Sequence, residues 1–192
     1  MKAAAGRLPP SHRVVAVAES VGSAPVLDIG AGSGLLEPFA PTPYIAVDGT
    51  RSALGTSPFR VVASATALPF RDRAAATTTC VSVLQYVVDV EAAMEELARV
   101  TQAGGTVVVL VPNLAYVRNI AKLLAGRFPW SSVKDDWRGG TVRYFTRRDL
   151  VPMVERTGFS VRRVRCSGRL RRLRSVWPDL LGADLLLELE RT

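Results

Sequence analysis

Short apolar runs separated by turn residues follow one another along the first two thirds of the chain. Each run is apolar almost without interruption, which is typical of parallel strands buried on both faces. A strand in an open antiparallel sheet would alternate apolar and polar residues instead. We therefore expect buried strands at Pro25–Ile29, Tyr44–Val47, Phe59–Ala63, Thr77–Leu84 and Thr106–Val111.

Stretches with helical spacing lie before and between these runs. In Val90–Val100, the side chains of Ala93, Leu97 and Val100 share one face. Ser11 and Gly22 have the residue types that begin and end a helix, and they enclose an apolar pattern that suits one amphipathic helix over the sheet edge or the ligand-binding mouth. Further helices are expected at Leu114–Leu124 and Arg147–Thr157. Alternating strands and helices predict a doubly wound α/β domain.

The C-terminal part breaks this alternation. Phe159–Cys166 and Asp184–Leu189 have the pattern of two strands, which we expect to close one sheet edge as an antiparallel pair. Arg127–Gly140 is aromatic, ends in glycine and lacks periodicity, so it is the candidate for a mobile lid. We expect one domain over residues 1–192, made of an N-terminal helix (1–23), a core (24–112), ligand-side helices with the lid (113–158) and closing strands (159–192).

Composition agrees with a single globular domain. The chain has 192 residues, of which 48% are apolar and 22% charged. No apolar stretch is long enough to span a bilayer, and Arg7, Pro9 and Pro10 interrupt any signal-peptide pattern, so we expect a cytoplasmic protein. Cys80 and Cys166 lie far apart in apolar runs, which predicts reduced thiols and neither a disulfide nor a metal site.

The positive charge is concentrated near the C-terminus. Residues 1–142 hold 13 Lys and Arg against 11 Asp and Glu, whereas residues 143–192 hold 12 against 6. This excess favours an anionic substrate, a nucleic acid or an acidic lipid surface, unless it is only a solvated edge.

A glycine-rich turn follows the first strand in the sequence Asp28-Ile29-Gly30-Ala31-Gly32-Ser33-Gly34. In α/β sheets, such a turn at a strand's carboxyl end is where nucleotides bind. A dinucleotide turn has the pattern GxGxxG, but here Leu35 follows Gly34, so pyrophosphate binding is disfavoured. The glycines instead let backbone approach an adenosine that carries a charged amino-acid tail, with Asp28 supplying negative charge.

Asp48 ends the second strand, twenty residues after Asp28. An acid at this place accepts hydrogen bonds from both ribose hydroxyls. After the third strand, the small residues Ser64, Ala65 and Thr66 suit close contact of the backbone with the adenine edge.

Four segments carry a resemblance through their order and spacing. They are VLDIGAGSG, YIAVD, SATALPF and CVSVLQYVVDVEAAMEELARVTQAGGTVVVLVPN. Together they resemble the type 11 class I methyltransferases that depend on S-adenosylmethionine (SAM). The part from Pro112 to Phe159 is similar to the MetW-like branch and to methyltransferases of bacterial glycan and small-molecule pathways. The resemblance implies a Rossmann-like class I methyltransferase fold, with SAM as cofactor and S-adenosylhomocysteine as product.

By this resemblance, each cofactor contact is assigned by position. The glycine turn would line the methionine end, Asp48 the ribose, residues 64–66 the adenine and residues 83–85 the floor of the reacting centre. The cofactor residues are then Asp28, Gly30, Ala31, Gly32, Gly34, Asp48, Gly49, Ser64, Ala65, Thr66, Val83, Leu84 and Gln85. The candidates for acceptor contact are Asn113, Tyr116, Arg118, Trp130, Trp137, Arg143 and Tyr144.

No catalytic signature is expected, because SAM carries its own leaving group and methyl transfer needs mainly positioning and exclusion of water. His12 and Tyr86 are the candidates for a catalytic base. We predict methyl transfer, on oxygen, to a small-molecule, glycan or carrier-linked acceptor that could be anionic, with Arg118 and Arg143 facing the cofactor's open side.

Three alternatives stay open at this stage. Nucleic-acid methylation is encouraged by the arginines but opposed by Ser82-Val83-Leu84-Gln85-Tyr86, which lacks the Asn- or Asp-Pro-Pro-aromatic run of such enzymes. A catalytically silent SAM-binding partner of another enzyme is the second. A nicotinamide oxidoreductase is the third, and it would need glycine in place of Leu35.

Overall fold

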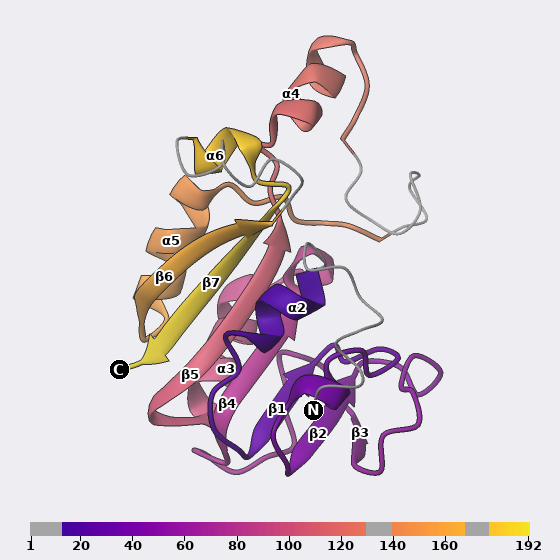
Figure 1. Cartoon of the computed structure of the whole chain (residues 1–192), viewed down its shortest axis with the longest axis vertical. Coiled ribbons are helices and arrows are strands. Elements are labelled where there is room, and N and C mark those ends of the chain that lie inside the picture. The colour runs from indigo at the N-terminus through magenta and orange to yellow at the C-terminus, as the bar shows by residue number, and fades with distance from the viewer. Residues whose placement is uncertain (1–12, 130–139, 168–176) are drawn as a thin grey trace.

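The computed structural model describes residues 13–129, 140–167 and 177–192, and one seven-stranded sheet runs through them (Figure 1). The strand order is β3-β2-β1-β4-β5-β7-β6. Strands β1 to β5 pair in parallel, β7 is antiparallel to β5, and β6 is antiparallel to β7. The strands are β1 Val26–Ile29, β2 Tyr44–Asp48, β3 Arg60–Val62, β4 Ala75–Val81, β5 Thr101–Pro112, β6 Phe159–Ser167 and β7 Asp184–Arg191.

The expected Rossmann-like α/β fold with a C-terminal antiparallel edge is confirmed, and the largest shifts are at two strand ends. β4 ends at Val81 rather than Leu84, because Ser82 has a positive φ of 56° and Leu84–Tyr86 forms the 3-10 turn η2. β5 begins at Thr101 rather than Thr106, since its first residue already pairs with Ala75 of β4.

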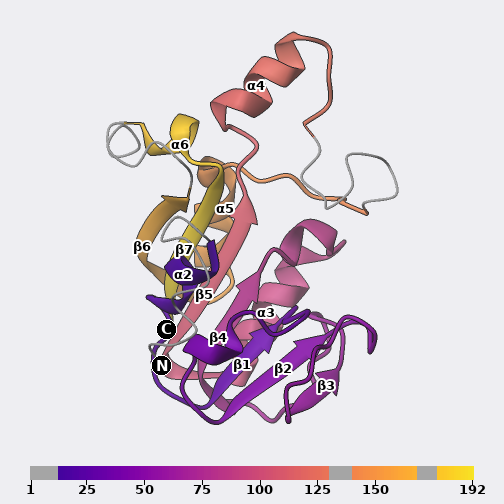
Figure 2. The same ribbon diagram turned by 45° about the vertical axis from the view of Figure 1, so that its right-hand side comes forward.

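Helices cover both faces of the sheet (Figures 1 and 2). On one face, α3 and α5 pack against the odd-numbered residues of β5 and β7, such as Val109 and Leu187. On the other face, α2 packs against Val108, Leu110 and Leu186. The helices are α2 Arg13–Ala18, α3 Val90–Val100, α4 Val117–Leu124, α5 Arg147–Arg156 and α6 Pro178–Leu181.

The helix bounds differ from the predicted ones where side chains fix the local chain. The start of α4 moves from Leu114 to Val117, because Asn113 accepts a hydrogen bond from the backbone N–H of Ala115 and holds a turn there. The helix α6 was not predicted. The segment after Gly34 has only the short 3-10 turn η1, Glu37–Phe39, among its prolines.

The helix α4 extends beyond the carboxyl end of β5, away from the sheet, in both views (Figures 1 and 2). None of its residues is buried. Among the described helices, none combines the length and apolar character that crossing a bilayer requires.

Candidate active site

The glycine turn that follows β1 has a backbone conformation that residues other than glycine rarely adopt. Gly30, Gly32 and Gly34 have φ angles of +76°, +51° and +77°. The N–H groups of Gly30 and Ala31 donate to the carbonyl of Val47, at 2.7 and 3.0 Å, and tie the turn to the end of β2. A Cβ on Gly32 would meet no atom within 4 Å, so the turn faces open space there.

Asp48 connects the end of β2 to this turn. Its Oδ2 accepts a hydrogen bond from the N–H of Gly32 at 3.1 Å, and its Oδ1 accepts one from the N–H of Thr50 at 3.1 Å. The side chain is only partly buried. Since a carboxylate has about four acceptor positions, roughly two of them stay available for the hydroxyls of a ligand.

Gly55 supports the turn from below and was not predicted from the sequence. Its N–H donates to the carbonyl of Gly32 at 3.0 Å. A Cβ on Gly55 would lie 2.5 Å from the carbonyl oxygen of Ser33, closer than real contacts allow. The only sequence signal for this role is a glycine in the loop after β2. The contact itself joins Gly55 to Gly32 and Ser33, which are distant along the chain, so the sequence does not reveal it.

Asp28 lies beneath the turn and is 3% exposed. Its Oδ2 accepts a hydrogen bond from the Tyr44 hydroxyl at 2.5 Å, and its Oδ1 accepts one from the Thr79 hydroxyl at 2.6 Å. Burial raises the pKa of this carboxyl from 3.8 to about 6, although the two hydroxyls oppose the shift. Neither Tyr44 nor Thr79 was predicted to take part in the site.

We expect this buried carboxyl to make stability depend on pH. Between pH 4 and 6 the unfolded chain releases the Asp28 proton while the folded chain retains it, so stability falls as pH rises through the folded pKa of about 6. Relative to Asp28→Asn, the wild type should lose about 2 kcal/mol of unfolding free energy between pH 4 and 7. Urea unfolding over this pH range measures the difference, and a gap between the two proteins that does not change with pH would contradict it.

The segments after β3 and β4 supply the rest of the predicted cofactor residues. The hydroxyls of Ser64 and Thr66 are 2.8 Å apart in a tight turn, and Ala65 is buried between them. After β4, Val83 contacts the glycine turn so closely that a Cβ on Gly30 would lie 2.0 Å from its Cγ2. The structure therefore brings the turn, Asp48 and Val83 together at the carboxyl ends of β1, β2 and β4.

Three buried side-chain oxygens, on η2 and on the segment 141–144, have no hydrogen-bond partner among the described residues. They are Oε1 of Gln85, the hydroxyl of Thr141 and the hydroxyl of Tyr144. The carbonyl of Gln85 accepts hydrogen bonds from the N–H groups of Val142 and Arg143, at 2.8 and 3.1 Å, so the two segments lie side by side. The Phe128 ring packs edge-on against the Tyr144 ring, at 5.2 Å between centroids. An unpaired buried polar group is costly, so these oxygens are candidates for contact with a ligand.

Other candidate residues are placed apart from this cluster. The Asn113 amide donates to the carbonyls of Asp179 and Gly182, at 2.7 and 2.8 Å, and so connects the end of β5 to the segment before β7. Arg118 is exposed on α4. The Arg143 guanidinium donates to the carbonyl of Val88.

The remaining candidates fall at the start of α4, on η2 or outside the description. Tyr116 precedes the first residue of α4, and Tyr86 is 39% exposed on η2. His12, Trp130 and Trp137 lie outside the described residues, as does most of the predicted lid. Arg13, next to His12, donates to the Ser82 hydroxyl at 3.3 Å. The helix α2 therefore begins near the carboxyl end of β4, on the same side of the domain as the glycine turn.

This arrangement suits a ligand with an adenosine and a charged tail. The open space at Gly32 admits a ligand close to the backbone, and the carboxylate of Asp48 offers acceptors for two hydroxyls. Among the described residues, no group of three or more His, Cys, Asp or Glu side chains is placed to hold a metal ion.

Several solved structures share the fold of this chain. A search of the curated proteins found no match. Among solved structures, the chain is similar to a SAM-dependent methyltransferase of Thermotoga maritima, a possible histamine N-methyltransferase, with 17% identity and a TM-score of 0.69 over 93% of this chain and 87% of that one. It is also similar to a SAM-dependent methyltransferase of Mesorhizobium loti, with 18% identity and a TM-score of 0.62 over 98% and 96%.

The family follows from a sequence model rather than from these distant structures. The model described as "Methyltransferase domain" matches residues 7–164, which is most of the chain. The matched part includes the glycine turn, Asp48 and the segment after β4. The chain therefore belongs to the methyltransferase domain family and is a SAM-dependent methyltransferase of the Rossmann-like class I fold.

Proposed function

We propose that this protein transfers the methyl group of SAM to an oxygen atom of a small-molecule or glycan acceptor held beside Gln85, Thr141 and Tyr144. The supporting observation is the set of three buried oxygens, on η2 and the segment beside it, that have no hydrogen-bond partner in the described part of the chain. An acceptor with hydroxyl or amide groups would satisfy them. We further propose that the chain belongs to the type 11 or MetW-like branch, on the segments that carry this resemblance.

On this proposal, the cofactor lies across the carboxyl ends of β1 and β2. The Asp48 carboxylate would accept hydrogen bonds from the ribose hydroxyls, the turn at Gly32 would adjoin the methionine end, and residues 64–66 would contact the adenine. SAM supplies an activated methyl group when bound, so the protein has mainly to align the acceptor and exclude water.

The Tyr144 hydroxyl is suited to donate a hydrogen bond rather than to accept a proton. Burial raises its pKa above the ordinary value for tyrosine, so the hydroxyl keeps its proton at neutral pH. It would then fix the orientation of an acceptor oxygen, as a positioning residue.

We expect Tyr144→Phe to separate a ligand-binding role from a structural one. The change removes a hydroxyl that has no partner among the described residues, so the free energy of unfolding should stay the same or rise. SAM affinity should also stay the same, while methyl transfer to an acceptor falls about 2- to 10-fold, the effect of one neutral hydrogen bond. Thermal unfolding, calorimetry and transfer of a labelled methyl group measure the three quantities.

Tyr44→Phe is the matched control, because the Tyr44 hydroxyl donates to buried Asp28. It should lower the unfolding free energy by about 1 to 3 kcal/mol. If Tyr144→Phe lowered stability in the same way, the hydroxyl would have a structural role instead.

Incubating the protein with labelled SAM and a metabolite mixture, followed by mass spectrometry of labelled products, tests the proposed activity. Transfer to a hydroxyl of a small molecule is the expected result. Tight SAM binding without any labelled product would favour a silent SAM-binding partner of another enzyme, and labelled RNA would favour the nucleic-acid alternative.

A further inference from the structure

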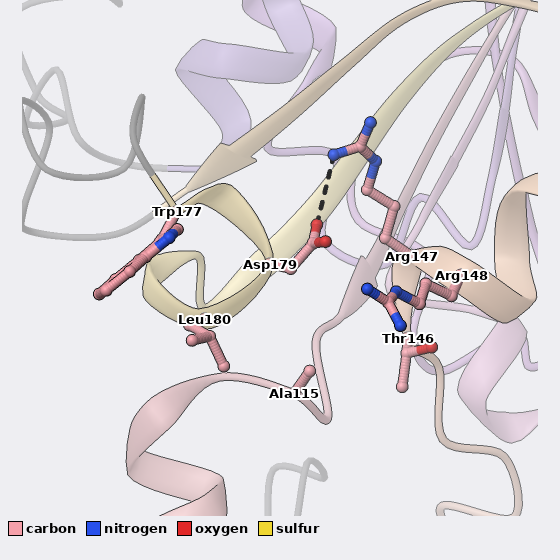
Figure 3. A pocket seen from close by; sticks show the side chains of 7 residues that line it. All are labelled: Ala115, Thr146, Arg147, Arg148, Trp177, Asp179 and Leu180. Carbon is pink, nitrogen blue, oxygen red and sulfur yellow. Dashed lines mark hydrogen bonds and ion pairs between the residues drawn. The ribbon is translucent and has the colours of Figure 1, made fainter.

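A cavity lies beyond the carboxyl end of β5, between the start of α5 and α6 (Figure 3). Its volume is about 580 Å³, within the usual range for small-molecule sites. None of the cofactor residues assigned above lines it. The lining residues are Ala115, Thr146, Arg147, Arg148, Trp177, Asp179 and Leu180.

One wall of this cavity is apolar. Leu180 lies on α6 and Trp177 directly precedes this helix. Ala115 lies opposite their side chains (Figure 3). Trp177 is 66% exposed and Leu180 is 39% exposed. Exposing two large apolar side chains on the wall of a cavity favours a ligand with an apolar body.

The other wall carries an excess of positive charge. Arg147 forms an ion pair with Asp179 at 3.4 Å, and this pair is partly exposed. Arg148 is exposed, has no ion pair or hydrogen bond within the described part of the chain, and points into the space between α6 and Ala115 (Figure 3). Since Arg147 offsets Asp179, Arg148 leaves a net charge of about +1 on the lining.

The position of Arg148 on the helix adds to the cost of its unpaired charge. Arg147 and Arg148 are the first residues of α5, where the helix dipole is positive and disfavours cations. The adjacent carboxylate of Asp149 accepts a hydrogen bond from the Thr146 hydroxyl at 2.5 Å and forms no ion pair with Arg148. An anion in the cavity would supply the missing negative charge.

We infer that this cavity binds an amphipathic organic anion, with its charged group at Arg148 and its apolar body against Trp177 and Leu180. The planar guanidinium of arginine suits carboxylate, sulfonate or phosphate groups. This binding does not depend on SAM, so the inference stands or falls separately from the proposed function.

Displacement of a fluorescent aromatic sulfonate, 1-anilinonaphthalene-8-sulfonate, by decanoate tests this inference. Decanoate, kept below its micelle concentration, should displace the probe from the wild type. Acetate has the charge without the apolar body and decanol has the body without the charge, so neither should compete at the same concentration.

Arg148→Gln should weaken decanoate binding by about tenfold, as expected for the loss of one hydrogen bond to a charged group. Arg163→Gln is the matched control, because Arg163 is an exposed arginine on β6 and the change in net charge is the same. Trp177→Ala should also weaken decanoate, and SAM affinity should stay constant in all three variants. Equal decanoate affinity in Arg148→Gln and the wild type, or equal competition by decanol, would overturn the inference.

Discussion

Asp48→Ala is expected to weaken SAM binding by roughly 10- to 150-fold, or about 1.5 to 3 kcal/mol. The carboxylate serves two purposes in this structure. On the proposed assignment it would accept hydrogen bonds from the ribose hydroxyls, and it accepts one from the N–H of Gly32, which holds the turn in place. Loss of both effects places the expected result at the upper end of the range. Calorimetric titration of SAM into the variant measures it.

Asp72→Ala is a suitable control for this experiment. Asp72 is also a carboxylate, but its side chain is 74% exposed and forms an ion pair with Arg99. We expect SAM affinity to stay within about twofold of the wild type. Should Asp48→Ala bind SAM as well as Asp72→Ala does, the assignment of Asp48 to the ribose would be wrong.

Gly55→Ala is expected to lower the unfolding free energy by about 1 to 3 kcal/mol and to weaken SAM binding as well. A Cβ at this position meets the backbone of Ser33, with the carbonyl oxygen at 2.5 Å, and backbone cannot move aside as a side chain can. The added methyl group therefore displaces the glycine turn. Chemical unfolding and SAM calorimetry on the same preparation measure the two effects.

Gly49→Ala provides the matched comparison, because a Cβ on Gly49 would have no atom within 4 Å and Gly49 does not have a positive φ. This change should leave stability unchanged or raise it by up to about 1 kcal/mol through the unfolded state. If the two alanine variants were equally stable, the support of the turn by Gly55 would be refuted.

The strands and the glycine turn could be predicted because their signals are local. An unbroken apolar run such as Tyr44–Val47 is enough to indicate a buried strand, and glycines after Asp28 are enough to indicate a turn. The exact ends could not be predicted, since the end of β4 depends on the positive φ of Ser82.

The contacts that complete the site are set by sheet register, which the sequence alone did not reveal. Parallel pairing places Asp28 opposite Thr79, 51 residues later in the chain. Likewise, Gln85 meets the segment at Val142 through backbone hydrogen bonds. Arg118 lies on α4, which extends away from the sheet, and Arg143 donates to the carbonyl of Val88, so their expected place on the cofactor's open side stays a prediction.

Calorimetric titration of the wild-type protein with SAM, S-adenosylhomocysteine and NAD tests the central claim most directly. The glycine turn and Asp48 converge at the carboxyl ends of β1 and β2, so SAM and S-adenosylhomocysteine should each bind one molecule per chain, and NAD should not bind. Binding of NAD without binding of SAM would contradict the account.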